Sequence, residues 1–270
     1  MLYDTHCHPY LANEKSQEVI LENFFSTGGN YLNTIACDLD SSQTCIDLAM
    51  KNSWVYATIW IHPTHVFDSE LSLETIISQL EVLYQKNSEH IVAIWETWLD
   101  YHWLESLSNK YAIPQDQVVS IQKDFFRAQI QLAKKLNLPI IIHNRNSAED
   151  VLEILIEQDC KNFVFHCYSE DYKYAQRLLQ HAPNCMLWFW WIVTFKSALP
   201  IQDAATKIPI RNIIIETDSP YLTPTPYRGK EENEPLYTRE VLSKIIDLRA
   251  EDSQTITQQI FKNSTRFFAI

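Results

Sequence analysis

The chain has 270 residues, with 22 Lys and Arg against 34 Asp and Glu, which gives a formal net charge of −12 at pH 7. This excess of acidic residues disfavours electrostatic binding of nucleic acid or of an anionic membrane over a broad surface, although metal ions can still bind phosphate locally. The sequence contains no run near the roughly 20 apolar residues of a membrane span, no secretion-signal pattern and no CxxC pair among its six cysteines. We therefore expect a cytoplasmic protein with reduced thiols.

Eight apolar runs rich in β-forming residues follow one another along the chain. They predict strands at 2–8, 31–37, 55–63, 91–97, 138–144, 162–167, 185–190 and 212–218. Amphipathic segments between them predict helices at 15–27, 42–52, 70–87, 115–137, 148–159, 170–181 and 236–248. Continuous apolar strands that alternate with helices are typical of a parallel sheet covered by helices, and eight such units favour a closed (β/α)8 TIM barrel. No linker divides the chain, so we expect one α/β domain over residues 1–270.

Ionisable residues stand at the ends of six of the eight predicted strands. These are His6 and His8, His62, Glu96, His143, His166 and Asp218, in chain order. A single histidine at a strand end is more often a hydrogen-bonded structural residue than a ligand. However, the carboxyl ends of all strands in a parallel barrel lie at one rim. Burying ionisable groups there costs free energy unless the groups are paired or bind metal. We expect these side chains to converge on one mouth.

The residue types indicate a metal site with mixed nitrogen and oxygen ligands. His6 and His8 point to the same side of their strand, because side chains alternate with a period of two, and Cys7 between them should pack on the opposite face. Four histidines with Glu96 and Asp218 suit zinc, manganese or magnesium. Six ligands are more than one tetrahedral ion needs, which favours two divalent ions with a shared carboxylate and a bridging hydroxide.

Seven motifs resemble, in order, those of the TatD family of metal-dependent deoxyribonucleases. They are DTHCH (4–8), IHP (61–63), the strand around Glu96 with LDY (99–101), PIIIHNR (139–145), FHCYS (165–169), IVTFK (192–196) and ETDSPYLTPTPYRGK (216–230). ETDSPYL followed by PYRGK is specific, whereas HxH alone would not be. The resemblance runs from residue 2 to roughly residue 265. It implies a (β/α)8 hydrolase that uses divalent metals to cleave phosphodiester bonds of DNA, often from a 3′ end.

The resemblance also implies roles for individual residues. The metal ligands would be His6, His8, Glu96, His143, His166 and Asp218, with Glu96 bridging and Asp218 orienting or deprotonating the attacking water. His62 and Arg145 would face the substrate phosphate, and a protonated His62 would help the leaving oxygen depart. Glu216 shares the strand face of Asp218 and would orient a ligand. The implied partner is DNA, with single-stranded ends as substrate, and neither a membrane nor an obligate protein partner is expected.

The residues expected to contact the substrate could instead have purely structural roles. His62 could simply cap its strand beside Pro63, and Arg145 could form a salt bridge with Glu149 or Asp150. Arg228 and Lys230 lie in a proline-rich loop, where they would either hold the DNA backbone or be solvated.

Tryptophan occurs where this family typically has glycine, and Glu170 is a further departure from its pattern. The chain has eight Trp and three Gly, whereas a glycine share of about 7% would give about 19 glycines. An indole supplies neither positive φ nor close backbone approach. We hypothesise that the organism reads UGA as glycine at most or all of Trp54, Trp60, Trp95, Trp98, Trp103, Trp188, Trp190 and Trp191. The alternative is genuine tryptophan that packs the core or stacks on DNA bases.

Three functions follow from these features. The favoured one is a two-metal deoxyribonuclease. The second is a related barrel hydrolase that cleaves a small amide, ester or lactone, because the same cluster can activate water against a carbonyl carbon. The third is a noncatalytic barrel, which gains weight if the tryptophans are genuine.

Overall fold

A computed structural model of the chain describes residues 1–60, 67 and 71–270, with the backbone alone for residues 95–98. Eight strands form one parallel sheet in the order of the sequence. They are β1 (Tyr3–Cys7), β2 (Tyr31–Thr34), β3 (Val55–Ile59), β4 (Ile91–Asp100), β5 (Ile140–Arg145), β6 (Phe163–Phe165), β7 (Met186–Phe189) and β8 (Ile213–Ile215).

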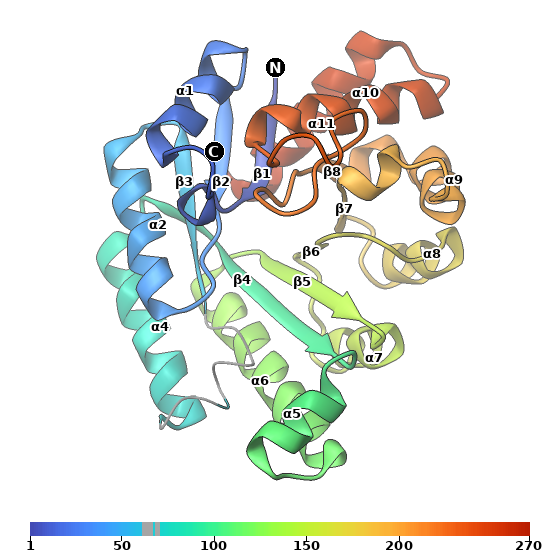
Figure 1. The fold of residues 1–270 in the computed structure, drawn as a ribbon. Helices are drawn as coiled ribbons and strands as arrows, with labels where there is room; N and C mark the ends of the chain where they lie inside the picture. Colours follow the sequence, from blue (N-terminus) through green and yellow to red (C-terminus); the bar gives the residue numbers. More distant parts are fainter. Residues whose placement is uncertain (61–66, 68–70) are drawn as a thin grey trace.

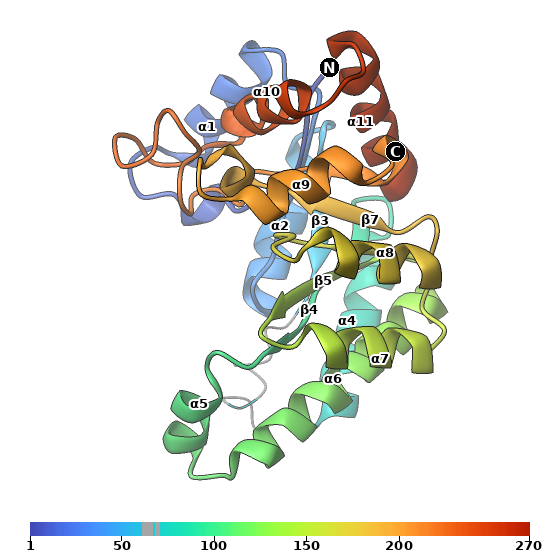
Figure 2. The ribbon, with the colours of Figure 1, turned by 90° about the vertical axis from the view of Figure 1, so that its right-hand side faces the viewer.

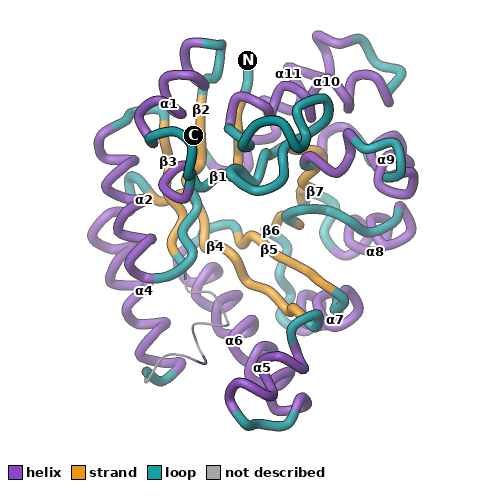
Figure 3. The backbone as a smooth tube through the Cα atoms, viewed as in Figure 1, coloured by secondary structure: helices purple, strands orange, loops and turns teal. Residues whose placement is uncertain are grey.

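Helices surround this sheet, as Figures 1 and 2 show from two sides, and in Figure 3 the strands lie inside the ring of helices. They are α1 (Gln17–Ser26), α2 (Leu39–Lys51), α4 (Leu73–Asn87), α5 (Leu104–Tyr111), α6 (Gln115–Leu136), α7 (Ala148–Glu157), α8 (Tyr172–His181), α9 (Leu199–Lys207), α10 (Thr238–Leu248) and α11 (Ser253–Phe268). The architecture is a single, nearly closed (β/α)8 barrel, which confirms the predicted fold class.

The predicted elements differ from the observed ones mainly at their ends. All eight predicted strands are present, but β2, β6 and β8 end two or three residues earlier than predicted. The backbone turns to a left-handed conformation soon after two of them, at Cys167 (φ +48°) and Asp218 (φ +56°). Helices α5, α9 and α11 were not predicted. The expected strand end at 61–63 lies outside the described residues.

The barrel closes between β1 and β8 through residues at its rim. Cys7 of β1 forms an isolated parallel bridge with Ser219, which follows β8. The amide of Asp218 donates to the His6 carbonyl at 3.0 Å, and the amide of His8 donates to the Ser219 carbonyl at 2.7 Å. The backbone that closes the barrel therefore also fixes His6, His8 and Asp218 relative to one another.

Side-chain alternation along the strands separates the apolar core inside the barrel from the apolar packing outside it. Ile141, Val164 and Ile214 belong to a cluster inside the barrel, together with Tyr3 and Trp188. Their strand neighbours pack outward among the helices. A residue two positions farther along an extended strand points to the same side. The inner positions at 141, 164 and 214 are thus followed at the mouth by 143, 166 and 216.

Candidate metal centre

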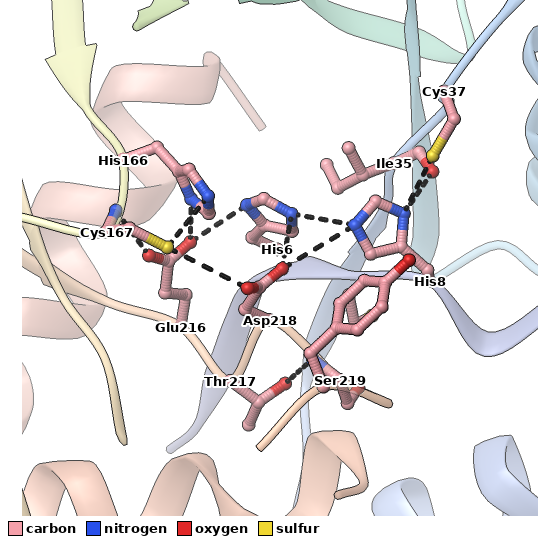
Figure 4. A network of polar contacts seen from close by, with 12 residues as sticks. His6, His8, Ile35, Cys37, His166, Cys167, Glu216, Thr217, Asp218 and Ser219 are labelled. Carbon is pink, nitrogen blue, oxygen red and sulfur yellow. Dashed lines mark hydrogen bonds and ion pairs between the residues drawn. The ribbon is translucent and has the colours of Figure 1, made fainter. Parts of the chain in front are cut away.

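Four of the predicted ligands meet at the carboxyl end of the barrel. His6 and His8 lie at the end of β1, His166 follows β6 and Asp218 follows β8 (Figure 4). The Nε2 atoms of His6 and His8 are 3.0 Å apart, and Asp218 Oδ1 lies 3.2 Å from His6 Nε2 and 3.7 Å from His8 Nε2. Donor atoms of His6, His166 and Asp218 all lie within 4.8 Å of one another. Such spacing suits donors of a single metal centre.

Glu216 is a fully buried carboxylate behind this cluster. Its Oε2 lies 2.7 Å from Nδ1 of His166 and 2.9 Å from Nδ1 of His6. Metal-binding histidines usually present their second ring nitrogen to a carboxylate, which fixes the tautomer and the ring orientation. Glu216 thus directs the Nε2 side of both rings into the mouth, and the two rings are stacked with centroids 4.0 Å apart.

The two histidines of β1 have opposite pKa shifts. Burial, followed by the neighbouring rings of His166, His8 and His143, lowers the pKa of His6 well below its ordinary value, so His6 is neutral, which is the form in which an imidazole can bind a cation. Burial also opposes the charged form of His8. Hydrogen bonds with Asp218 and Cys37 outweigh this effect and raise the pKa of His8 to about 10. Without metal, His8 holds a proton against the Asp218 carboxylate.

Asp4 is a buried site residue that the sequence analysis missed. Its carboxylate accepts hydrogen bonds from the amide and the hydroxyl of Thr217, at 3.0 and 2.6 Å, and from the amide of His6 at 3.3 Å. Asp4 therefore ties the end of β1 to the segment that carries Glu216 and Asp218. The available signal was its position two residues before His6, on the same face of a strand.

Asp218 is the most accessible member of the cluster. Its side chain is 14% exposed, against 1% for His6 and 0% for Glu216. Its positive φ is uncommon outside glycine and carries strain of about 1–3 kcal/mol, which the surrounding hydrogen bonds must hold. This turn brings the carboxylate to the rim, where water and substrate can reach it.

The structure places His143 and Arg145 farther out along β5. The half-buried His143 ring lies 5.8 Å from the His166 ring, but within the described residues its nitrogens do not join the tighter donor groups. Arg145 is exposed, with its guanidinium 5.8 Å from the Trp103 ring. Its two alternative partners pair elsewhere in the described part of the chain, Glu149 with Arg177 and Asp150 with Lys123.

Arg228 and Lys230 lie on the exposed loop after β8. The Arg228 guanidinium stacks 4.0 Å from the centroid of Phe195 and 5.6 Å from that of Trp191. Both cations line a hollow of about 580 Å³ that also contains Glu14, Glu231 and Glu232. The acidic lining moderates the positive charge of this hollow.

Two predicted site residues cannot be placed in the cluster. His62 lies outside the described residues. Glu96 lies in β4, but its side chain is not described. Their roles stay predictions.

The described tryptophans have ordinary backbone conformations. The positive-φ residues of the described chain include no tryptophan, so positive φ gives no support to the recoding hypothesis at these positions. Trp188 is fully buried inside the barrel, its indole donates to the Thr5 hydroxyl, and its ring lies 5.6 and 5.7 Å from the rings of His6 and His166. Trp60 and Trp191 are also buried, whereas Trp54 and Trp103 are largely exposed.

The chemistry of these donors fits a divalent cation. Neutral imidazoles and carboxylates form a set that suits zinc or manganese, and the buried Glu216 supplies the orienting contact that such sites require. A larger hollow of about 720 Å³ lies at the opposite end of the barrel, beside Ile91, Pro139, Met186 and Phe268, away from this cluster. No helix among the described residues has the length and apolar character needed to cross a membrane.

Comparisons with known proteins agree with this geometry. The family described as TatD related DNase matches residues 3–269. The uncharacterized metal-dependent hydrolase YabD of Bacillus subtilis (strain 168) is 34% identical over 273 residues, covering 100% of both chains. The uncharacterized metal-dependent hydrolase MG009 of Mycoplasma genitalium is 32% identical and covers 98% of each chain. The crystal structure of YjjV, a TatD homologue from Escherichia coli K12, has a TM-score of 0.86 at 22% identity and covers 100% of this chain and 98% of its own. The chain belongs to the TatD family of metal-dependent hydrolases.

Proposed function

We propose that this hydrolase is a deoxyribonuclease that removes nucleotides from the 3′ ends of single-stranded DNA with two divalent ions, Mg²⁺, Mn²⁺ or Zn²⁺. The observation that carries the proposal is the convergence of His6, His8, His166 and Asp218 at the barrel mouth. The description of the matching family supports the choice of DNA. The six free cysteines fit the cytoplasmic setting that is part of the proposal.

Each residue of the cluster has a definite task in this reaction. Divalent ions would make hydroxide available near neutral pH and stabilise the charge that develops on phosphorus. His6, His8 and His166 would hold these ions with Asp218, and His143 and Glu96 would complete the proposed set. Asp218 orients the attacking water and accepts its proton, because its carboxylate is the exposed one. Glu216 keeps the rings of His6 and His166 fixed during turnover.

The proposed substrate contacts are Arg145, Arg228, Lys230 and His62. Arg145 is an exposed cation at the end of β5, and Arg228 and Lys230 are exposed cations on the loop after β8. They would bind the phosphates of the strand, and His62 would assist the leaving oxygen. Because the whole chain carries a formal charge of −12, these contacts should be few and short in range.

The test is metal-dependent release of nucleotides from single-stranded DNA labelled at either end. We expect loss of a 3′ label first, abolished by chelation and restored by Mg²⁺, Mn²⁺ or Zn²⁺. Untouched DNA together with turnover of small esters, lactones or cyclic amides would replace the proposal with the carbonyl hydrolase. If His143→Ala and Asp218→Asn retain the fold and lose the activity, the noncatalytic barrel is excluded.

A further inference from the structure

Cys167 has a backbone conformation that points its thiol to the same place as the ring of His166. Consecutive residues of a strand point to opposite faces, so a strand through both would send the sulfur away from the site. Instead, β6 ends at Phe165 and Cys167 adopts a left-handed φ of +48°. Two hydrogen bonds hold the turn: the amide of Cys167 donates to Glu216 Oε1 at 2.8 Å, and the amide of Tyr168 donates to the Trp188 carbonyl at 2.9 Å.

The sulfur lies on the side of the cluster where a cation would bind. Glu216 lies 2.7 Å from Nδ1 of His166, which makes Nε2 the nitrogen directed at a metal. Cys167 Sγ lies 2.8 Å from this Nε2 and 3.8 Å from Asp218 Oδ2 (Figure 4). Two donors in one tetrahedral zinc shell are separated by about 3.5 Å, given the usual Zn–N and Zn–S bond lengths. The Sγ–Nε2 distance would have to open by about 0.7 Å to reach this spacing, whereas the Sγ–Oδ2 distance is within about 0.3 Å of it.

Cys7 and Cys160 do not share this placement, and the sulfur of Cys37 lies on the Nδ1 side of His8, 3.8 Å from that nitrogen. Cys7 lies between His6 and His8, but its thiol donates to the Asn33 carbonyl at 3.3 Å, and it packs in a separate apolar cluster. Cys160 is buried at the opposite end of β6, before the strand begins. The position of the Cys167 sulfur is thus a property of the turn after β6.

We propose that Cys167 is a thiolate ligand of the metal centre, on the same ion as His166 and Asp218. On binding, the S–H bond breaks, the proton leaves to solvent and a sulfur–metal bond forms, with no change of oxidation state. A soft sulfur donor favours zinc over magnesium or manganese, so Cys167 biases the choice of metal. This inference rests on the metal-hydrolase assignment and is independent of the proposed DNA substrate.

Cobalt substitution tests the proposal directly, because thiolate bound to Co²⁺ gives a near-ultraviolet charge-transfer band. The cobalt-loaded protein should show this band, and Cys167→Ser and Cys167→Ala should lose it while they still bind cobalt. Cys160→Ser is the matched control at the other end of the strand and should keep the band. We further expect Cys167→Ser to weaken Zn²⁺ binding at least about tenfold, with a smaller effect on Mn²⁺.

The outcomes separate this inference from the proposed function. A cobalt-loaded protein that lacks the band, or a band that survives in Cys167→Ala, overturns the role of Cys167 and leaves the nuclease proposal intact. A protein with the band that does not degrade DNA supports Cys167 and rejects the nuclease. If the folded chain binds no cobalt and no zinc, the role of Cys167 is rejected, and the nuclease proposal is rejected as well if neither Mg²⁺ nor Mn²⁺ supports release of nucleotides.

Discussion

Glu216 holds His166 through a 2.7 Å contact between Oε2 and Nδ1, and the same oxygen lies 2.9 Å from Nδ1 of His6. One buried carboxylate therefore fixes two predicted ligands. We expect Glu216→Gln to lower the affinity for Zn²⁺ by about 10- to 100-fold, because an amide oxygen is a weaker acceptor for both rings. Competition with a chromophoric chelator measures this change. Unchanged affinity with retained circular dichroism would show that Glu216 only supports the fold.

Asp218 should be needed for turnover more than for folding. Asp218→Asn keeps the size of the side chain and removes its capacity to accept a proton from water. We expect kcat to fall by about 10²- to 10⁴-fold at saturating metal. Metal content, measured by plasma mass spectrometry, separates lost catalysis from lost binding. Asp203→Asn, in an exposed pair with Lys207, is the control and should leave kcat unchanged. Near-normal kcat in Asp218→Asn would remove Asp218 from the reaction.

The raised pKa of His8 makes metal binding depend on pH. At pH 8 the folded metal-free protein keeps the proton on His8, since its pKa is about 10, and a bound cation must displace it. We expect the wild type, on loading with metal, to release about one proton more per protein molecule than His8→Asn does. Calorimetry in buffers of different ionisation enthalpy measures the difference. Equal proton release in the two proteins would contradict this assignment.

The same shift has a consequence for the stability of the metal-free protein. The pKa of His8 in the folded protein lies above its ordinary value of 6.5. Protonated His8 therefore stabilises the folded state fully below pH 6.5, and this contribution is lost as the pH rises through about 10. The Tm of the metal-free wild type should therefore fall between pH 7 and pH 10.5. His8→Asn should show a flatter profile, whereas His90→Asn, a substitution outside the cluster, should follow the wild type. Parallel profiles for all three proteins would refute the coupling.

The fold was predictable because its signals are local. Continuous apolar runs such as Ile140–Ile142 and Ile213–Ile215 are buried strands, and the rule that barrel strands end at one rim brings His6, His8, His166 and Asp218 together. Cys167 and Asp4 escaped prediction for a physical reason. The left-handed turn at Cys167 breaks the period-two alternation of side chains along a strand. The hydrogen bond between Asp4 and Thr217 joins residues 213 positions apart.

Arg228 offers a test of the substrate contacts. Its guanidinium is stacked on Phe195, so it is held near the mouth although it is exposed. We expect Arg228→Ala to raise KM for DNA several-fold with little change in kcat. For the wild type, the logarithm of the DNA-binding constant should fall only gently with the logarithm of the salt concentration, because few phosphates are contacted. Arg211→Ala, on the segment before β8 at the other end of the barrel, is the control. A steep salt slope would contradict the expectation of few contacts.

Trp188 is the position at which the recoding hypothesis has the largest structural consequence. Its indole fills the barrel beneath the mouth, within 6 Å of the rings of His6 and His166. A glycine there would leave this space to solvent or to the metal cluster. If tryptophan is the native residue, its removal by Trp188→Gly opens a cavity and should cost about 3–5 kcal/mol of stability. Denaturant unfolding of recombinant Trp188→Gly and of the parent chain measures this difference in the free energy of unfolding.

Mass spectrometry of the protein from its native source tests the hypothesis directly. We expect peptides that span 187–196 and 91–101 to carry glycine at Trp188, Trp190 and Trp191 and at Trp95 and Trp98. Glycine at these positions would open the site, and activity should then be assayed on a recoded chain. Tryptophan at these positions would refute recoding. The buried Trp188 side chain would then occupy space beside His6 and His166 in the native protein. The carbonyl hydrolase and the noncatalytic barrel would therefore have to be tested before the nuclease.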